Sequence, residues 1–325
     1  MVLVVVLSLA SALLNATSSI LQKQGSKRTP TDESLKASLV ADLLRRPSYL
    51  AGIGALIAAF VLQAGALSQG QLSTVQPVLA AELLFLMGIL AVWSRRHVGR
   101  REWAGAAAIA VGVGGFLAVA SPSGGSGRAG PLGWALTGAA VVAVLAVLLS
   151  VGHAARGSRR AALFGAAGAV AFAVTAALVK VSVAVLAHQG VAALFGSWRP
   201  YAMAVAGAGA VFFSGNAFQR GSVAAAQAAL SSVDPLVSIG IGVGLFGEHL
   251  RASPVDLAVE AVALLVMLAG IVVLSQSPLI TGVNADNRNA NADDPNAGTP
   301  RPDPELRNEG LPVRRGAQPA RRAAT

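Results

Sequence analysis

Two acidic residues lie in the middle of long apolar segments, where a carboxylate is costly unless it has a task. Glu82 lies about halfway through the apolar run at residues 72–93, and Asp234 about halfway through the run at residues 222–246. An ionised carboxylate in hydrocarbon costs roughly 2.5–3.5 kcal/mol on insertion scales, so each is expected to face protein, water or a passing solute. Proton uptake, cation binding or a counter-charge for a cationic substrate would be the chemistry. A structural acid that fixes helix packing is the alternative for both.

Neutral polar residues and prolines accompany the two acids. Four amides are candidates for contact with a substrate or a coupling ion: Gln63, Gln76, Asn216 and Gln227. Such side chains either line a solute path or hydrogen-bond neighbouring helices to one another. Pro77 and Pro235 each remove a backbone donor near an acid, so both are candidate helix breaks of the kind that expose carbonyl groups in transporters. Kinks without function are the alternative.

Five further residues receive a structural interpretation. Lys180 is late in an apolar run, and its long stem is expected to carry the amine to the membrane interface. Glu248 and His249 follow a predicted helix end and are expected to be solvated loop residues. Gly240 and Gly244 form a GxxxG pattern, which predicts close contact between helices.

Composition places these residues in an all-α integral membrane protein. Of the 325 residues, 54% are hydrophobic and 12% charged, and the mean hydropathy is +0.63. The apolar residues form runs of about 20 residues, the length a helix needs to cross a bilayer, and they do not alternate as barrel strands do. The net charge of +10 is concentrated beside apolar runs, which favours a role in membrane topology over nucleic-acid binding.

Several kinds of chemistry are excluded or unsupported. The chain has no cysteine, which excludes disulfides and thiolate metal sites, and its four histidines form no spaced ligand cluster. No GxxxxGK[ST] phosphate loop occurs, so the chain is not expected to be an ATP-driven pump. We therefore predict no enzyme activity and no cofactor.

Nine membrane-spanning helices are predicted. They cover residues 2–21, 49–67, 72–93, 102–120, 131–151, 161–186, 201–218, 222–246 and 254–274. The first run resembles a signal peptide but lacks a charged start and a convincing cleavage site, so it is interpreted as a retained helix. A short surface helix is expected at residues 34–44.

Charges in the connecting segments predict the orientation. With the N-terminus outside, fourteen basic residues fall in inner connections and three in outer ones, which is a strong positive-inside asymmetry and places the C-terminus in the cytoplasm. The three outer residues are Arg128, Arg199 and Arg251. The predicted location is the cytoplasmic membrane.

The sequence predicts an internal duplication. Shifts of 151, 155 and 157 residues align residues 66–76 with 217–227, 115–119 with 270–274, and 18–23 with 175–180. Each copy has four helices, and one linking helix separates them, so the second copy would be inverted in the membrane. The predicted organisation is a first repeat at 1–120, a linker at 121–160, a second repeat at 161–275 and a disordered cytoplasmic tail at 276–325. The 151-residue shift places Glu82 beside Asp234, one position out of register.

Two segments resemble motifs of the drug/metabolite transporter superfamily, including its EamA-like members. These are residues 221–250, with a mid-helix proline followed by Gly247 and Glu248, and residues 70–77 followed by residues 100–105. The nine-helix layout is similar to that of NIPA-like magnesium transporters. The resemblance covers about residues 1–275 and implies transport without specifying a substrate.

The sequence therefore predicts a secondary transporter that moves a small metabolite or drug by alternating access. A magnesium or other divalent-cation transporter or channel is one alternative, because hard carboxylate and amide oxygens suit such ions. A non-transporting membrane scaffold or regulator is another. The expected partners are a small-molecule or ion substrate and the lipid bilayer, with no nucleic acid. A homodimer is left open.

Overall fold

The structure, a computed structural model, describes residues 1–26, 47–94, 98–120, 123–124, 129–219, 222–249 and 253–277. Nine helical spans in this part of the chain are long and apolar enough to cross a membrane. The prediction of an all-α, multi-pass membrane protein is thereby confirmed. The surface helix expected at residues 34–44 and nearly all of the predicted tail lie outside the described residues.

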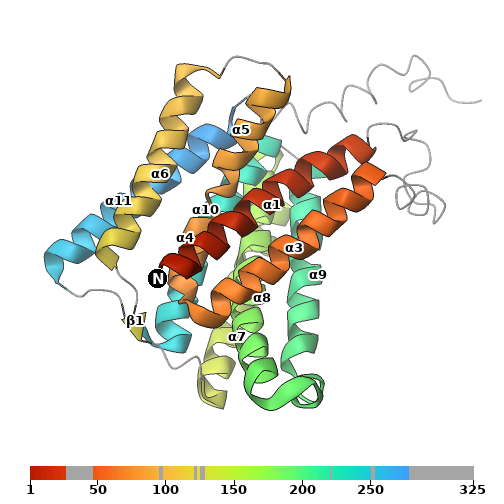
Figure 1. Ribbon diagram of the computed structural model, residues 1–325, viewed down its shortest axis with the longest axis vertical. Helices are drawn as coiled ribbons and strands as arrows, with labels where there is room; N and C mark the ends of the chain where they lie inside the picture. The colour runs from red at the N-terminus through yellow and green to blue at the C-terminus, as the bar shows by residue number, and fades with distance from the viewer. Residues whose placement is uncertain are drawn as a thin grey trace, which may run out of the picture. The chain divides into compact units, whose positions relative to one another are not determined.

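The helices agree closely with the apolar runs (Figure 1). They are α1 (Val2–Ser26), α3 (Pro47–Gln69), α4 (Leu72–Leu79), α5 (Glu82–Ser94), α6 (Arg100–Ala120), α7 (Pro131–Ala154), α8 (Gly157–Phe195), α9 (Arg199–Gln219), α10 (Val223–Phe246) and α11 (Pro254–Ser275). Two short strands, β1 (Ser123–Gly124) and β2 (Glu248–His249), pair antiparallel. This agreement is explained by long runs of Ala, Leu and Val that are ended by Gly and Pro, which interrupt helices.

One predicted helix is interrupted. The run at residues 72–93 is not continuous, because α4 ends at Leu79 and α5 begins at Glu82. Between them the backbone makes hydrogen bonds of the 3₁₀ type, each from a residue to the one three positions before it. They run from Ala80 N to Pro77 O at 3.2 Å and from Ala81 N to Val78 O at 3.0 Å. Pro77 has no N–H to donate and its ring disturbs the turn before it, inside α4, so this loss alone does not explain an interruption three residues after the proline.

The opposite result holds for Pro235. Helix α10 runs from Val223 to Phe246 with Pro235 inside it, so the helix break expected there is wrong. A proline removes one hydrogen bond of the ladder, and a helix packed against neighbours can retain its course despite that loss. Helix α8 is longer than predicted and extends to Phe195, with a non-helical residue at Gly190 (φ 83°, ψ −179°).

Helix pairs organise the bundle. The most extensive packing joins α1 to α3, α6 to α11, and α8 to both α9 and α10, and these neighbours are visible in Figure 1. One buried core, containing Leu67, Leu72, Leu178 and Phe246, lies among α1, α3, α4, α8 and α10. A second core contains Ile109 and Met267 and joins α6 to α11.

Close helix contact depends on glycines other than the predicted pair. A Cβ on Gly240 or Gly244 would meet nothing within 4 Å, so the close contact predicted from this GxxxG pattern is wrong. Gly242, between them, faces the other way, where a Cβ would collide with the Glu248 carboxylate and lie 3.4 Å from Ser73 N. At 3.6 residues per turn, helix positions two apart point in nearly opposite directions, whereas positions four apart share a face. The pattern therefore identified the right segment but the wrong face.

Candidate functional site

The two predicted acids are brought near each other. Glu82 is the first residue of α5, and Asp234 lies in the middle of α10. Their carboxylates are close enough for their negative charges to interact, and both side chains are half-buried. The only hydrogen bond to either is a long one, 3.4 Å from Ser238 Oγ to Asp234 Oδ1, among the residues the structure describes. No cationic side chain in that part of the chain pairs with them.

The four predicted amides lie on four different helices, α3, α4, α9 and α10, the last of which carries Asp234. Gln76 is buried on α4, which packs against α10. Gln63 is half-buried on α3. Asn216 donates to Phe212 O on its own helix α9 at 2.8 Å, and Gln227 donates to Ser231 Oγ on α10 at 3.0 Å. The amide groups of Asn216 and Gln227 are therefore engaged locally, within one turn.

No cluster of metal-ligating side chains accompanies the acids. Across the described ranges, no group of three or more His, Cys, Asp or Glu residues could hold a metal ion. A cation bound by Glu82 and Asp234 would therefore need water, amide or backbone oxygens to complete its coordination. This donor set suits a hydrated or transient cation better than a resident structural metal.

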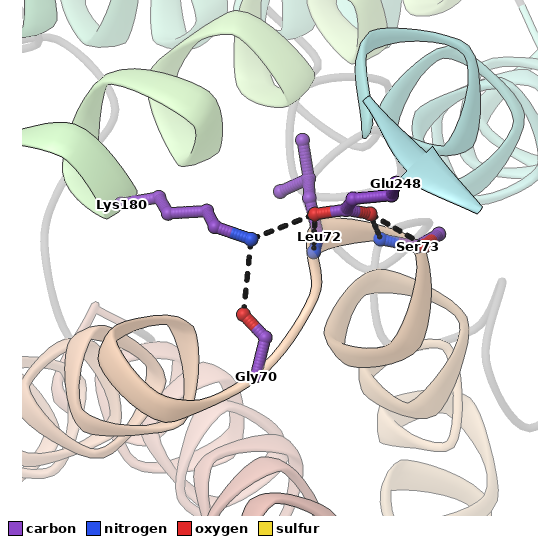
Figure 2. A network of polar contacts seen from close by, with 5 residues as sticks. All are labelled: Gly70, Leu72, Ser73, Lys180 and Glu248. Carbon is purple, nitrogen blue, oxygen red and sulfur yellow. Dashed lines mark hydrogen bonds and ion pairs between the residues drawn. The ribbon is translucent and has the colours of Figure 1, made fainter. Parts of the chain in front are cut away.

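A second polar site lies at the end of the bundle where α3 ends and α4 begins (Figure 2). The Glu248 carboxylate accepts four hydrogen bonds: from Leu72 N at 2.7 Å, Ser73 N at 3.0 Å, Ser73 Oγ at 2.5 Å and Lys180 Nζ at 2.7 Å. Lys180 Nζ also donates to Gly70 O at 3.0 Å. We call these five residues the Glu248 cluster.

The local chain explains why Glu248 reaches this position. Helix α10 ends at Gly247 in the left-handed conformation (φ 63°), which glycine adopts without steric cost and which turns the next residue back toward the bundle. Helix α4 has no side-chain cap of its own at Gln71. Glu248 supplies that cap from 176 positions away, satisfying two free amides and placing negative charge at the positive end of the helix.

Electrostatics favour the charged form of Glu248. Burial by itself would raise the pKa of this carboxyl, but the Lys180 charge and the hydrogen bonds from Lys180 and Ser73 outweigh it, so the pKa is lowered. The Lys180 amine also lies 5.3 Å from the centre of the Phe246 ring, a cation–π distance. Trp134 contacts Phe246 edge-on, and Trp198 contacts Trp134 edge-on. One aromatic ring, that of Phe246, therefore lies beside the ion pair, and the two tryptophans pack on from it.

The structural interpretation of Glu248 is thus wrong, because Glu248 is 2% exposed and fully bonded, not a solvated loop residue. Lys180 makes an ion pair with it, and whether the amine also lies at a membrane interface stays a prediction. A sequence signal existed, namely two opposite charges at the same predicted end of two neighbouring spans. The contact partners on α4 are main-chain amides, which no pattern of side chains indicates.

The comparisons with known proteins give a similarity to an uncharacterized protein, which carries no function. An uncharacterized protein of Corynebacterium glutamicum is similar to this chain, with 26% identity over 277 residues, which cover 85% of this chain and 95% of the relative. No family model matches the chain, and no solved structure matches it. Fold and site together define a multi-pass helical membrane protein with two acid-containing sites. The resemblance to drug/metabolite transporters stays a prediction.

Proposed function

We propose that this chain is a secondary transporter of the cytoplasmic membrane, with Glu82 and Asp234 as its coupling or substrate-binding groups. The carrying observation is that these two half-buried carboxylates interact near the middle of two spans, with no cationic partner among the described residues. Adjacent like charges in such a place are relieved by a proton or by a bound cation. A group that gains and loses its charge in this way can couple solute movement to an ion.

An inverted repeat is part of the proposal, and the packing of α6 against α11 supports it. A Cβ on Gly112 would lie 2.5 Å from Met267 N. These residues are 155 positions apart, the same shift that aligns residues 115–119 with 270–274. A residue that contacts its own counterpart lies on the axis relating two copies.

Two flanking contacts follow the same rule. A Cβ on Gly115 would lie 3.5 Å from Ala263 Cβ, and a Cβ on Gly270 would lie 2.9 Å from Ala108 Cβ. Adding 155 to Gly115 and Ala108 gives Gly270 and Ala263, so one contact is made twice. The partner number on α11 falls as the number on α6 rises, so the helices are antiparallel. Counterpart helices of opposite direction are what an inverted repeat requires.

The pairing of α1 with α3 and of α8 with α9 adds independent support. Ser18 Oγ donates to Gly52 O at 2.8 Å, while a Cβ on Gly207 would lie 3.8 Å from Thr175 Cγ2. Ser18 and Thr175 are aligned by the 157-residue shift, and Gly52 and Gly207 differ by 155. The first helix pair of each predicted copy thus uses equivalent positions.

Divalent-cation transport is the second candidate, and the acid pair favours it too. Two neighbouring carboxylates are hard ligands suited to a hydrated divalent ion. Flux into proteoliposomes separates the two candidates, because magnesium uptake that ignores a proton gradient would favour the cation. A lack of flux across a broad solute panel would favour a scaffold or regulator.

Substitution of Asp234 tests the site itself. In the metabolite-transport proposal, Asp234→Asn removes proton-coupled flux, whereas Asp256→Asn is the matched control because Asp256 accepts a hydrogen bond at the start of α11, away from mid-span. Transport by Asp234→Asn with an unchanged pH dependence would show that Asp234 is not the proton carrier.

A further inference from the structure

We propose that the Glu248 cluster is a releasable latch that closes one end of the bundle between its two halves. This inference rests on the proposed transport function, because it names the contact that must open for alternating access. It assigns to Lys180, Glu248 and Ser73 a role that goes beyond helix capping.

The first step of the argument is where the contacts cross. Gly70, Leu72 and Ser73 belong to the turn between α3 and α4, in the first half of the chain, while Lys180 and Glu248 come from α8 and from the segment after α10. Every hydrogen bond of the cluster except that between Lys180 and Glu248 therefore joins one half to the other (Figure 2). Releasing Glu248 and Lys180 would break all of these cross-links together.

The second step concerns the kind of seal. A buried ion pair contributes little net stability compared with well-packed apolar side chains, because each charge loses its hydration. When such a seal opens, water returns to both charges and to the freed amides, so opening costs less than separating an apolar seal of equal size. A buried ion pair with hydrogen-bonded amides therefore suits a contact that must both close and open.

The third step concerns the attachment of Glu248. This residue is not on a helix but on β2, directly after the left-handed Gly247 and paired through its backbone with Gly124 of β1. A short arm of this kind can change its backbone angles without unwinding α10. Ser238, one turn along α10 from Gly242 toward Asp234, is completely buried.

Cysteine labelling tests the latch without any substrate. The natural chain contains no cysteine, so Ser238→Cys in an otherwise unchanged full-length protein is a unique reporter between the cluster and Asp234. A membrane-impermeant maleimide is applied to cells from the side on which the cluster lies. We expect slow labelling with the latch intact and a rate about tenfold higher or more with Glu248→Gln. A tenfold change needs the equilibrium between the closed and open latch to shift by only about 1.4 kcal/mol.

Two further variants keep the test decisive. Ser73→Ala removes one donor while keeping both charges, so it is expected to fold and to label at an intermediate rate. Glu260→Gln is the control, because Glu260 is also a buried acid but lies in α11, outside the cluster. The reporter in this variant should be labelled at the same rate as the reporter alone.

The outcomes are separable. Fast labelling of the reporter with the cluster intact, or folded Glu248→Gln and Ser73→Ala proteins that label no faster than the control, would overturn the latch. Faster labelling in the order Ser73→Ala and then Glu248→Gln supports it. If labelling follows this order but no solute is ever transported, the latch stands and the proposed transport function fails.

Discussion

The two acid-containing sites differ in how their negative charge is balanced. At the end of the bundle, Glu248 accepts four hydrogen bonds, including one from the paired amine of Lys180. Near mid-span, Glu82 and Asp234 face each other's charge, and the long hydrogen bond from Ser238 is the one contact of this kind that the described residues provide. The first site is saturated by hydrogen-bond donors of the protein, whereas the second receives a single long hydrogen bond from the described residues.

This difference separates structural from exchangeable chemistry. A carboxylate whose donors all come from the protein leaves no position for a ligand, so it can only hold or release protein segments. Carboxylates without protein donors must find a proton, a cation or water. We therefore propose that the same residue type serves a latch at one place and a transport site at another, and the predictions below test that contrast.

The largest expected effect comes from removing the cation of the saturated site. Lys180→Met leaves the buried Glu248 carboxylate without its ion-pair partner, which costs about 3–5 kcal/mol of unfolding free energy in comparable cases. Thermal unfolding in detergent measures the loss. The double variant Lys180→Met with Glu248→Gln should recover part of it, and equal melting temperatures for the single and double variants would show that the charge is not what matters.

A smaller effect is expected when the same site is disturbed sterically. Gly242→Ala places a methyl group against the Glu248 carboxylate and close to Ser73 N, so it should lower the unfolding free energy by about 1–3 kcal/mol, as overpacking does. Gly244→Ala, with nothing within 4 Å of its added methyl group, should be neutral or slightly stabilising. A larger loss at Gly244 would contradict the packing described for this face.

The unsaturated site should respond with the opposite sign. Neutralising it with Glu82→Gln and Asp234→Asn removes two neighbouring like charges. The free energy of unfolding at neutral pH should therefore stay the same or rise by roughly 1 kcal/mol, and the melting temperature should follow it. Flux in proteoliposomes should be lost in the same protein. A strongly lowered melting temperature would mean that these acids hold the fold in the way that Glu248 does.

Much of the fold could be predicted from the sequence, since it follows from local composition. Long apolar runs ended by Gly, Pro and charge give nine spans, most of whose ends lie within a few residues of those in the structure. The largest departure is the end of α8, at Phe195 instead of residue 186, whereas α7 begins at the predicted Pro131. The two prolines behave differently: Pro77 lies near a helix break, whereas the packed helix α10 tolerates Pro235. Whether a proline interrupts a helix depends on its neighbours, which local sequence does not reveal.

The sites were harder to predict because they depend on distant contacts. Depth along a span could be counted, and this alone identified Glu82 and Asp234. Of the saturated site, the opposite charges of Lys180 and Glu248 left a signal, but the partners on α4 left none, because Glu248 binds main-chain amides that lie 175 and 176 positions away. Gly242 and Gly244 are two residues apart, and only the three-dimensional packing distinguishes the one that touches Ser73.

The smallest expected effect is the acid dependence of the saturated site. Because the folded pKa of Glu248 is lowered from its ordinary value of 4.5, its ionised form contributes stability that is fully present above pH 4.5 and is lost as pH falls through the lower folded value. The melting-temperature difference between the unsubstituted protein and Glu248→Gln should therefore stay constant from pH 7 to about pH 5 and narrow only in more acidic buffer. A difference that already narrows between pH 7 and pH 6 would mean that Glu248 is not held in its charged form, and the contrast with Glu82 and Asp234 would disappear.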